Sequence, residues 1–243
     1  SQEECMTNLS IFSEYVKVKN FDAAYEPWKQ VYENCPELNY ATFSYGERIL
    51  NYRIDKATGA AKEAEVKALL DLVAKTRTCF PDRATLAGVL IDEAIIKSDN
   101  KMGSDLEVFQ LLDRAVNEDG ANFKNPKAIY LYFSVLVDLN AAGQKDLDEV
   151  FAAYDVVKEK IDEEFASLNK TAASLSDKQD SGTALTSREE RMLQVAENNS
   201  KVFNQISESI DVKLGNLANC DNLIPLYQRN FAAKKGDIRW VKG

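Results

Sequence analysis

The chain contains no histidine among its 243 residues. That absence removes the commonest general base, the commonest metal ligand and the usual partner of a serine or cysteine nucleophile. The four cysteines, Cys5, Cys35, Cys79 and Cys220, include no Cys-x-x-Cys pair, which argues against a structural zinc site. We therefore predict that the protein is not an enzyme and has no catalytic residue, no metal and no cofactor.

Glycine and proline are also scarce, with 10 and 5 residues, which is too few for a sandwich of many short strands joined by tight turns. No apolar run approaches the roughly 20 residues that a transmembrane helix needs. The net charge is −9, and no basic stripe is present to contact nucleic-acid phosphates. We expect no transmembrane segment and no nucleic-acid partner.

What the sequence does contain is a succession of amphipathic helices in pairs. Polar or glycine-containing turns separate the two helices of a pair, and Cys-Pro or Cys-Phe-Pro follows the second helix of the first two pairs. The predicted pairs are 4–18 with 21–34, about 39–56 with 60–80, 82–99 with 106–120, and 126–143 with 146–170.

The remaining segments complete the predicted domain organisation. Residues 1–170 form an array of helix pairs, and the small, polar residues 171–186 predict a mobile loop, which we hypothesise takes part in partner recognition. Residues 187–243 begin with a long helix over about 187–218, which we expect to be longer than its neighbours, and continue into the start of a further pair, in the same domain. That last segment is cut short, so we expect the natural chain to extend beyond Gly243.

The first pair carries a resemblance to a known repeat. Residues at five positions fall where the tetratricopeptide repeat (TPR) has an aromatic, an aromatic, a small residue, a large residue and a proline: Tyr15, Phe21, Ala24, Trp28 and Pro36. Ala24 lets the two helices approach closely, and Pro36 prevents the second helix from continuing. The chain departs from the family at Phe12 and Val31, where a small residue and an alanine are preferred.

Elsewhere the resemblance is looser. The fourth pair shares Gly143, Leu147, Val150 and Tyr154 with the repeat, and Gly46 and Gly88 are predicted close-packing positions in the second and third pairs. The resemblance implies an all-α fold, a right-handed solenoid of four to five antiparallel helical hairpins. An irregular helical bundle would show the same amphipathic helices and stays open as an alternative.

The opening stretch "ECMTNLSIFSEY…NFDAAYEPWKQVYENCPE" also resembles exported TPR envelope proteins of Bacteroidota-type bacteria. This resemblance implies a periplasmic or outer-membrane-associated location rather than a cytoplasmic one. No signal peptide is recognisable, and Ser1–Glu4 suits either a processed N-terminus or a trimmed chain.

Hairpin geometry places Cys5, at the start of the first helix, beside Cys35, at the end of its antiparallel partner. We predict a disulfide between them, with Cα atoms less than about 7 Å apart. The alternative is two separate buried thiols, which would suit a cytosolic protein.

In TPR arrays the first helix of each hairpin lines a concave face that binds extended peptides or helices. The resemblance therefore implies a partner-binding surface from the second and fourth hairpins: Tyr40, Phe43, Glu47, Asn51, Tyr130, Phe133 and Asn140. Alternatively, the rings pack between neighbouring repeats. Carboxylate clusters such as Asp92-Glu93 are interpreted as solvated helix faces.

The predicted function is a non-catalytic protein–protein interaction scaffold of the bacterial cell envelope. It would present a curved surface to a protein or peptide, which could belong to a larger envelope complex. The alternative is a ligand- or glycan-binding envelope protein that resembles the helical-repeat starch-uptake lipoproteins, for which several exposed aromatics should gather in a pocket.

Overall fold

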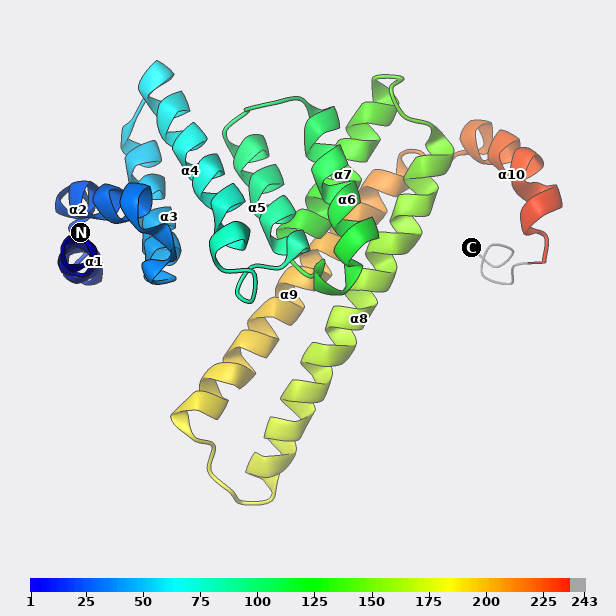
Figure 1. Cartoon of the computed structure of the whole chain (residues 1–243). Coiled ribbons are helices and arrows are strands. Elements are labelled where there is room, and N and C mark those ends of the chain that lie inside the picture. The colour runs from blue at the N-terminus through cyan, green and yellow to red at the C-terminus, as the bar shows by residue number, and fades with distance from the viewer. Residues whose placement is uncertain (237–243) are drawn as a thin grey trace. The chain divides into compact units, whose positions relative to one another are not determined.

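The computed structural model describes residues 1–236, which form ten α-helices and two short 3-10 helices, with no β-strand among these residues (Figure 1). The predicted all-α class is therefore confirmed, whereas the right-handed solenoid of four to five hairpins stays a prediction. Two compact units, Ser1–Asn122 and Phe123–Gly243, divide the chain and are described separately. This boundary falls within the predicted array of residues 1–170. The segment 237–243, predicted to begin another helix, lies outside the described residues.

Six α-helices build the N-terminal unit and follow one another as three pairs: α1 (Gln2–Lys17) with α2 (Phe21–Asn34), α3 (Ala41–Lys56) with α4 (Gly59–Cys79), and α5 (Leu86–Asp99) with α6 (Asp105–Asp119). Single-turn 3-10 helices follow α2 and α6, at Pro36–Leu38 and Gly120–Asn122. The two members of each pair pack on each other, and α2–α3 and α4–α5 contacts join successive pairs. All three pairs are those predicted from the sequence.

Local side chains set where these helices begin. Ser1 and Glu4 form a capping box at α1, and Ser104 and Glu107 form another at α6. Asn20 caps α2 through its side chain. Caps of this kind satisfy amides of the first turn, which have no partner within the helix.

Trp28 of α2 anchors the first helix pair to the second. Its side chain is 3% exposed, and Nε1 donates a hydrogen bond of 2.7 Å to the backbone carbonyl of Thr42 in α3. A Cβ atom at Gly46 would lie 2.5 Å from that Nε1 atom and 2.7 Å from Cδ1 of Leu72, so only glycine fits there. Gly46 is thus a close-packing position, as predicted. At Gly88 the prediction was wrong, because a Cβ there would meet only the capping side chain of its own helix.

A disulfide joins Cys5 of α1 to Cys35, the C-terminal cap of α2, with Cα atoms 6.4 Å apart. The predicted pairing is confirmed. Closing a loop of about 30 residues contributes roughly 3–4 kcal/mol of stability in the chain-entropy model. Cys79, which is half-buried, and Cys220, which is exposed, are free thiols.

Four α-helices form the described part of the C-terminal unit: α7 (Pro126–Ala141), α8 (Leu147–Asp180), α9 (Ser187–Gly215) and α10 (Cys220–Lys234). α7, α8 and α9 each contact the other two, while α10 contacts α8. α8 and α9 run antiparallel as a long hairpin (Figure 1). Although these two are long, none of the helices in residues 1–236 combines the length and the apolar character that a membrane crossing requires.

The predicted mobile loop 171–186 is mostly helical, so that prediction was wrong over residues 171–180. α8 continues to Asp180, and only residues 181–186 connect it to α9. Leu175 is 8% exposed within this extension, and Lys178 pairs with Glu189 of α9 at 2.7 Å. One buried leucine and a cross-helix ion pair therefore hold a stretch whose small residues we read as loop. The helix beginning at Ser187 ends at Gly215 and, with 29 residues, is shorter than α8, with 34, although we expected it to exceed its neighbours.

Candidate interaction surface

The predicted surface residues of α3 divide into a buried aromatic end and an exposed polar end. Phe43 is 2% exposed, and its ring lies 5.6 Å from that of Phe80 and 5.9 Å from that of Tyr32. Tyr40 is half-buried against Phe80, with the Arg83 guanidinium 5.6 Å from its ring centre. The prediction of Phe43 as a partner-binding residue was wrong, because these rings pack between helices.

The predicted residues of α7 serve the interior of the C-terminal unit. Phe133 is fully buried with its ring 6.1 Å from that of Tyr154, so its prediction as a binding residue was also wrong. Asn140 uses its Nδ2 to donate a 2.9 Å hydrogen bond to the carbonyl of Lys145, which closes the turn between α7 and α8. Tyr130 is half-buried. A binding role for Tyr130 and Asn140 stays a prediction.

Glu47 and Asn51 remain as the accessible part of the predicted α3 surface. They lie one helical turn apart, so both point to the same side of α3, and both are exposed. Within the part of the chain that the structure describes, neither side chain makes a hydrogen bond or an ion pair. Both are therefore available to an external partner.

Asp92 of α5 joins this pair from the neighbouring helix hairpin. Its side chain is exposed, yet the protein packed around it and the carboxylate of Glu47 raise the pKa of Asp92 to about 6. No cation lies within ion-pair distance of Asp92 among residues 1–236. Glu47 of α3 therefore acts electrostatically on Asp92 of α5, and neither carboxylate has a cationic partner among residues 1–236.

The basic residues of α3 are engaged elsewhere. Arg48 lies over the rings of Phe21 and Tyr45, at 5.8 and 5.6 Å from their centres. Arg53 pairs with Glu65 at 2.6 Å, and Lys56 pairs with Asp22 at 3.4 Å. None of these three side chains is paired with Glu47, so the acidic surface keeps its negative charge.

Sequence reasoning missed Asp92 because its carboxylate was read, together with that of Glu93, as part of a solvated helix face. Glu93 fits that reading, since it pairs with Lys97 one turn away at 3.4 Å. The available signal was topological: α3 and α5 are the first helices of successive hairpins, and in the predicted stack of helix pairs such helices would lie side by side.

We define the α3–α5 surface as Glu47, Asn51 and Asp92. Two carboxylates and one amide suit a positively charged group, such as the side chain of lysine or arginine, through charge-assisted hydrogen bonds. The described residues contain no group of three or more cysteines or carboxylates placed to hold a metal ion. The surface therefore offers acceptor groups that suit a cation, and we assign it no chemical step.

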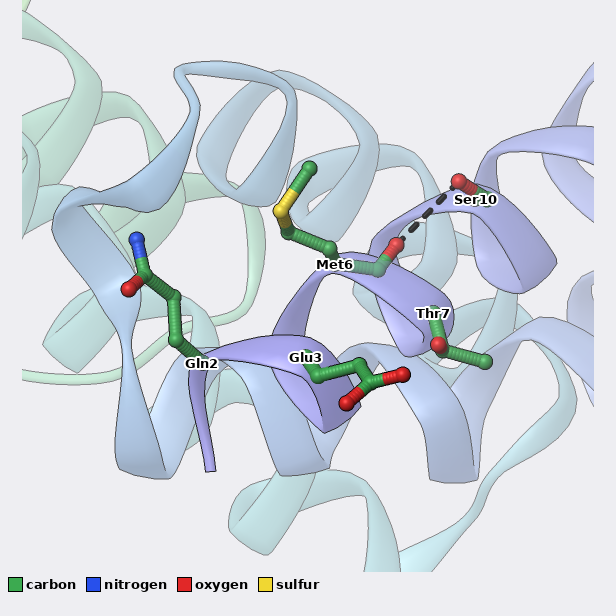
Figure 2. A pocket seen from close by; sticks show the side chains of 5 residues that line it. All are labelled: Gln2, Glu3, Met6, Thr7 and Ser10. Carbon is green, nitrogen blue, oxygen red and sulfur yellow. Dashed lines mark hydrogen bonds between the residues drawn. The ribbon is translucent and has the colours of Figure 1, made fainter.

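Two hollows lie elsewhere on the molecule. The first, of about 590 Å³, is lined by α1 alone, through Gln2, Glu3, Met6, Thr7 and Ser10 (Figure 2). The Ser10 hydroxyl in it is turned back onto the carbonyl of Met6 at 3.1 Å. The second, of about 600 Å³, is lined by residues at the start of α8 and along α10, namely Asp146, Leu147, Asp148, Asp221, Asn222, Pro225 and Arg229. Neither hollow contains an aromatic side chain.

No family model matches the chain, and no curated protein matches it either. The resemblance to the TPR family accordingly stays a prediction from the residues of the first helix pair. The functional argument therefore rests on the geometry of the site.

Proposed function

We propose that this protein is a non-catalytic interaction scaffold of the bacterial cell envelope, and that its α3–α5 surface binds a positively charged side chain of a protein or peptide partner. The observation that carries the proposal is the unpaired Glu47–Asp92 carboxylate pair. Burial of the Asp92 carboxyl is the larger cause of its raised pKa, and the neighbouring negative charge of Glu47 adds to it, because like charges disfavour the doubly ionised state. A bound lysine or arginine would offset the repulsion between the two carboxylates, and this gain would favour the complex over the free protein.

The proposed location in the envelope has two supports. The Cys5–Cys35 disulfide suits an oxidising compartment such as the periplasm. The resemblance of the first helix pair to exported TPR envelope proteins points to the same compartment. The partner would be a protein or peptide, alone or within a larger envelope complex.

The glycan-binding alternative gains no support from the surface features described. It requires exposed aromatic rings gathered in a pocket, and neither hollow has one. Phe43 and Phe133, which it could have used, are buried. We therefore do not propose it.

The test is capture of partners from envelope extract by the full chain, with identification by mass spectrometry. The double variant Glu47→Gln/Asp92→Asn removes both unpaired carboxylates. Its matched control is Asp55→Asn/Glu63→Gln, which makes the same change of charge at exposed residues that make no ion pair. We expect a partner that wild type and the control retain and that the first variant loses.

Two further measurements test whether the contact is electrostatic and involves Asp92. Because the contact is electrostatic and exposed, capture should weaken as salt rises from about 0.05 to 0.5 M. In the isolated complex, the pKa of Asp92, followed by carboxyl NMR, should fall below its value in the free protein. Capture that is equal for all three proteins would disprove the proposed surface.

A further inference from the structure

The N-terminal half of α9 carries an apolar face that no described helix covers. Met192, Val195 and Val202 are 45%, 56% and 39% exposed, and Asn199 between them is exposed as well. Their spacing of three, four and three residues places all four on one side of the helix, as in the seam of a coiled coil. We call Met192, Val195, Asn199 and Val202 the distal face of α9.

The C-terminal half of α9 lies in a different setting, because α7 packs there. Along the hairpin Tyr154 meets Asp211, with a 2.9 Å hydrogen bond, and the ring of Phe165 lies 6.1 Å from that of Phe203. α7 is fixed to the same part of α8: its Phe133 contacts Tyr154, and Lys124, just before α7, pairs with Glu164 at 3.6 Å. α7 also contacts α9. Beyond this level the α8–α9 hairpin continues without α7 (Figure 1).

At one set of positions along α9, burial increases towards the end at which α7 packs. Residues at every seventh position of the seam are Met192, Asn199, Ile206 and Lys213; the first two are exposed and the last two are half-buried. Lys213, near the C-terminal end of α9, is thus less exposed than Met192, near the N-terminal end, although lysine is the more polar residue. At these positions α9 is therefore more covered at its C-terminal end than at its N-terminal end, whereas Ser209 and Asn216, which continue the series of Val195 and Val202, are exposed.

We infer that the distal face of α9 docks an amphipathic helix of a partner protein, placed in line with α7. A helix fits because the face is a single stripe at helical spacing, the pattern by which helices pack on one another. Residues 188–202 span roughly 22 Å, or about four turns, so the partner segment needs about 15 residues. The inference concerns a different unit from the α3–α5 surface and does not depend on the function proposed above.

The charge beside this face defines the chemistry of the partner. Arg188 and Arg191 are exposed, and neither pairs with a carboxylate among residues 1–236. A partner helix with aspartate or glutamate beside its apolar stripe would pair with both. A second copy of this chain would bring the same two arginines to the contact, so an acidic partner helix is the better complement.

The test measures binding of two labelled synthetic helices to the full chain. Both helices have about 15 residues, or four turns, and the same leucine stripe. One carries glutamate beside the stripe and the other carries lysine. Fluorescence anisotropy measures binding. We expect the glutamate helix to bind about tenfold or more tightly than the lysine helix, since both arginines would be paired. Met192→Asp/Val195→Asp should weaken binding of the glutamate helix by about tenfold or more. Val212→Asp, at a residue of α9 that is 68% exposed and off the seam, should leave it unchanged.

Reversing the charge of the two arginines gives the more decisive test. Arg188→Glu/Arg191→Glu should exchange the preference, so that the lysine helix becomes the tighter ligand. All substituted residues are exposed, so the variants should unfold at the wild-type temperature, which thermal unfolding checks. Absence of binding, or a preference that survives charge reversal, overturns the inference. Sedimentation velocity that shows a dimer dissociated by Val195→Asp would also overturn it, because the occupant would then be a second copy.

Discussion

The N-terminal unit and the distal α8–α9 hairpin hold their helices together by different means. In the N-terminal unit a chain of ring contacts crosses three helices: Tyr25 to Trp28 at 5.8 Å, Trp28 to Tyr32 at 5.3 Å, Tyr32 to Phe43 at 5.9 Å, and Phe43 to Phe80 at 5.6 Å. The distal α8–α9 hairpin instead depends on isolated contacts such as Lys178 with Glu189 at 2.7 Å. Partly exposed ion pairs contribute less than about 1 kcal/mol each.

This difference indicates where each unit can bind partners. Large buried rings make the N-terminal helices mutually dependent, which gives the α3–α5 surface a rigid support. The distal hairpin has few buried apolar side chains, so it should open locally at lower free energy than the rest. A helix docked on α9 would supply the missing packing. The predictions that follow test this contrast, beginning with the largest effect.

Trp28→Ala should cause the largest loss of stability. Removing a buried tryptophan, its ring contacts and its hydrogen bond to the Thr42 carbonyl should cost about 3–5 kcal/mol of unfolding free energy. Urea unfolding measures the loss. Tyr15→Ala is the control, because Tyr15 is 37% exposed and should cost much less. Equal losses would show that the ring network is not what stabilises this unit.

The double variant Cys5→Ala/Cys35→Ala should lower the unfolding free energy by roughly 3–4 kcal/mol, since the unfolded chain regains the freedom of the closed loop. Hydrogen exchange in residues 123–236 should not change. Alkylation before reduction should label Cys79 and Cys220 and leave the other two cysteines unlabelled. Labelling of Cys5 without reduction would remove both the disulfide and its support for an oxidising compartment.

Leu175→Ala should act locally, with a cost of about 2–3 kcal/mol that appears as faster amide exchange in residues 165–203. Leu175 is the buried apolar side chain of the α8 extension, so its loss should open the distal hairpin first. Ser176→Ala, at an exposed neighbour, is the control. Faster exchange spread evenly over both units would contradict the view that the hairpin opens independently.

Glu189→Gln should remove a pH dependence from the same hairpin. The hydrogen bond from Lys178, with those from Thr186, lowers the pKa of Glu189 to about 2. A carboxylate whose folded pKa is depressed stabilises the folded state above its unfolded pKa, and that contribution is lost as pH falls from about 4.5 towards 2. Exchange in the wild-type hairpin should therefore speed up over this window more than it does in the variant. Identical pH profiles would exclude the pair as a source of stability.

Asp92→Asn should show the opposite sign and the smallest effect. Because the folded pKa of Asp92 is raised from 3.8 to about 6, the folded state binds more protons than the unfolded chain in that window. This contribution to stability is present at low pH and is lost as pH rises from about 4 to 6. The variant should be slightly more stable than wild type at pH 7 and lose that advantage near pH 4. Thermal unfolding at both values measures the change, and Glu47→Gln should reproduce part of it.

The sequence predicted the helix pairs well where local signals were strong. α2 was expected over 21–34 and is found at Phe21–Asn34, because Asn20 caps its start and Pro36 follows its end. α8 was expected to stop near residue 170, since alanines, serines and a threonine follow without an apolar stripe. One side chain, Leu175, and the pair of Lys178 with α9 extend it. Both depend on the position of α9, which local patterns do not specify.

The candidate site was only half predictable for the same reason. Glu47 and Asn51 followed from repeat geometry within one helix, and both are exposed as expected. Phe43 and Phe133 occupied equivalent predicted positions, yet each ring is buried by a neighbouring helix. Asp92 could be recognised as part of the site only because Glu47, on another hairpin, raises its pKa in the folded protein.

Helix positions and the Cys5–Cys35 pairing could be read from the chain because apolar period, caps and prolines act within a few residues. Three features were decided only in the folded molecule: which rings are buried, the electrostatic influence of Glu47 on Asp92, and the point along α9 beyond which α7 no longer packs. Each depends on the rotation and lengthwise position of one helix against another. Those quantities are set by the packing of side chains far apart in sequence, and helical periodicity is the same for every such arrangement.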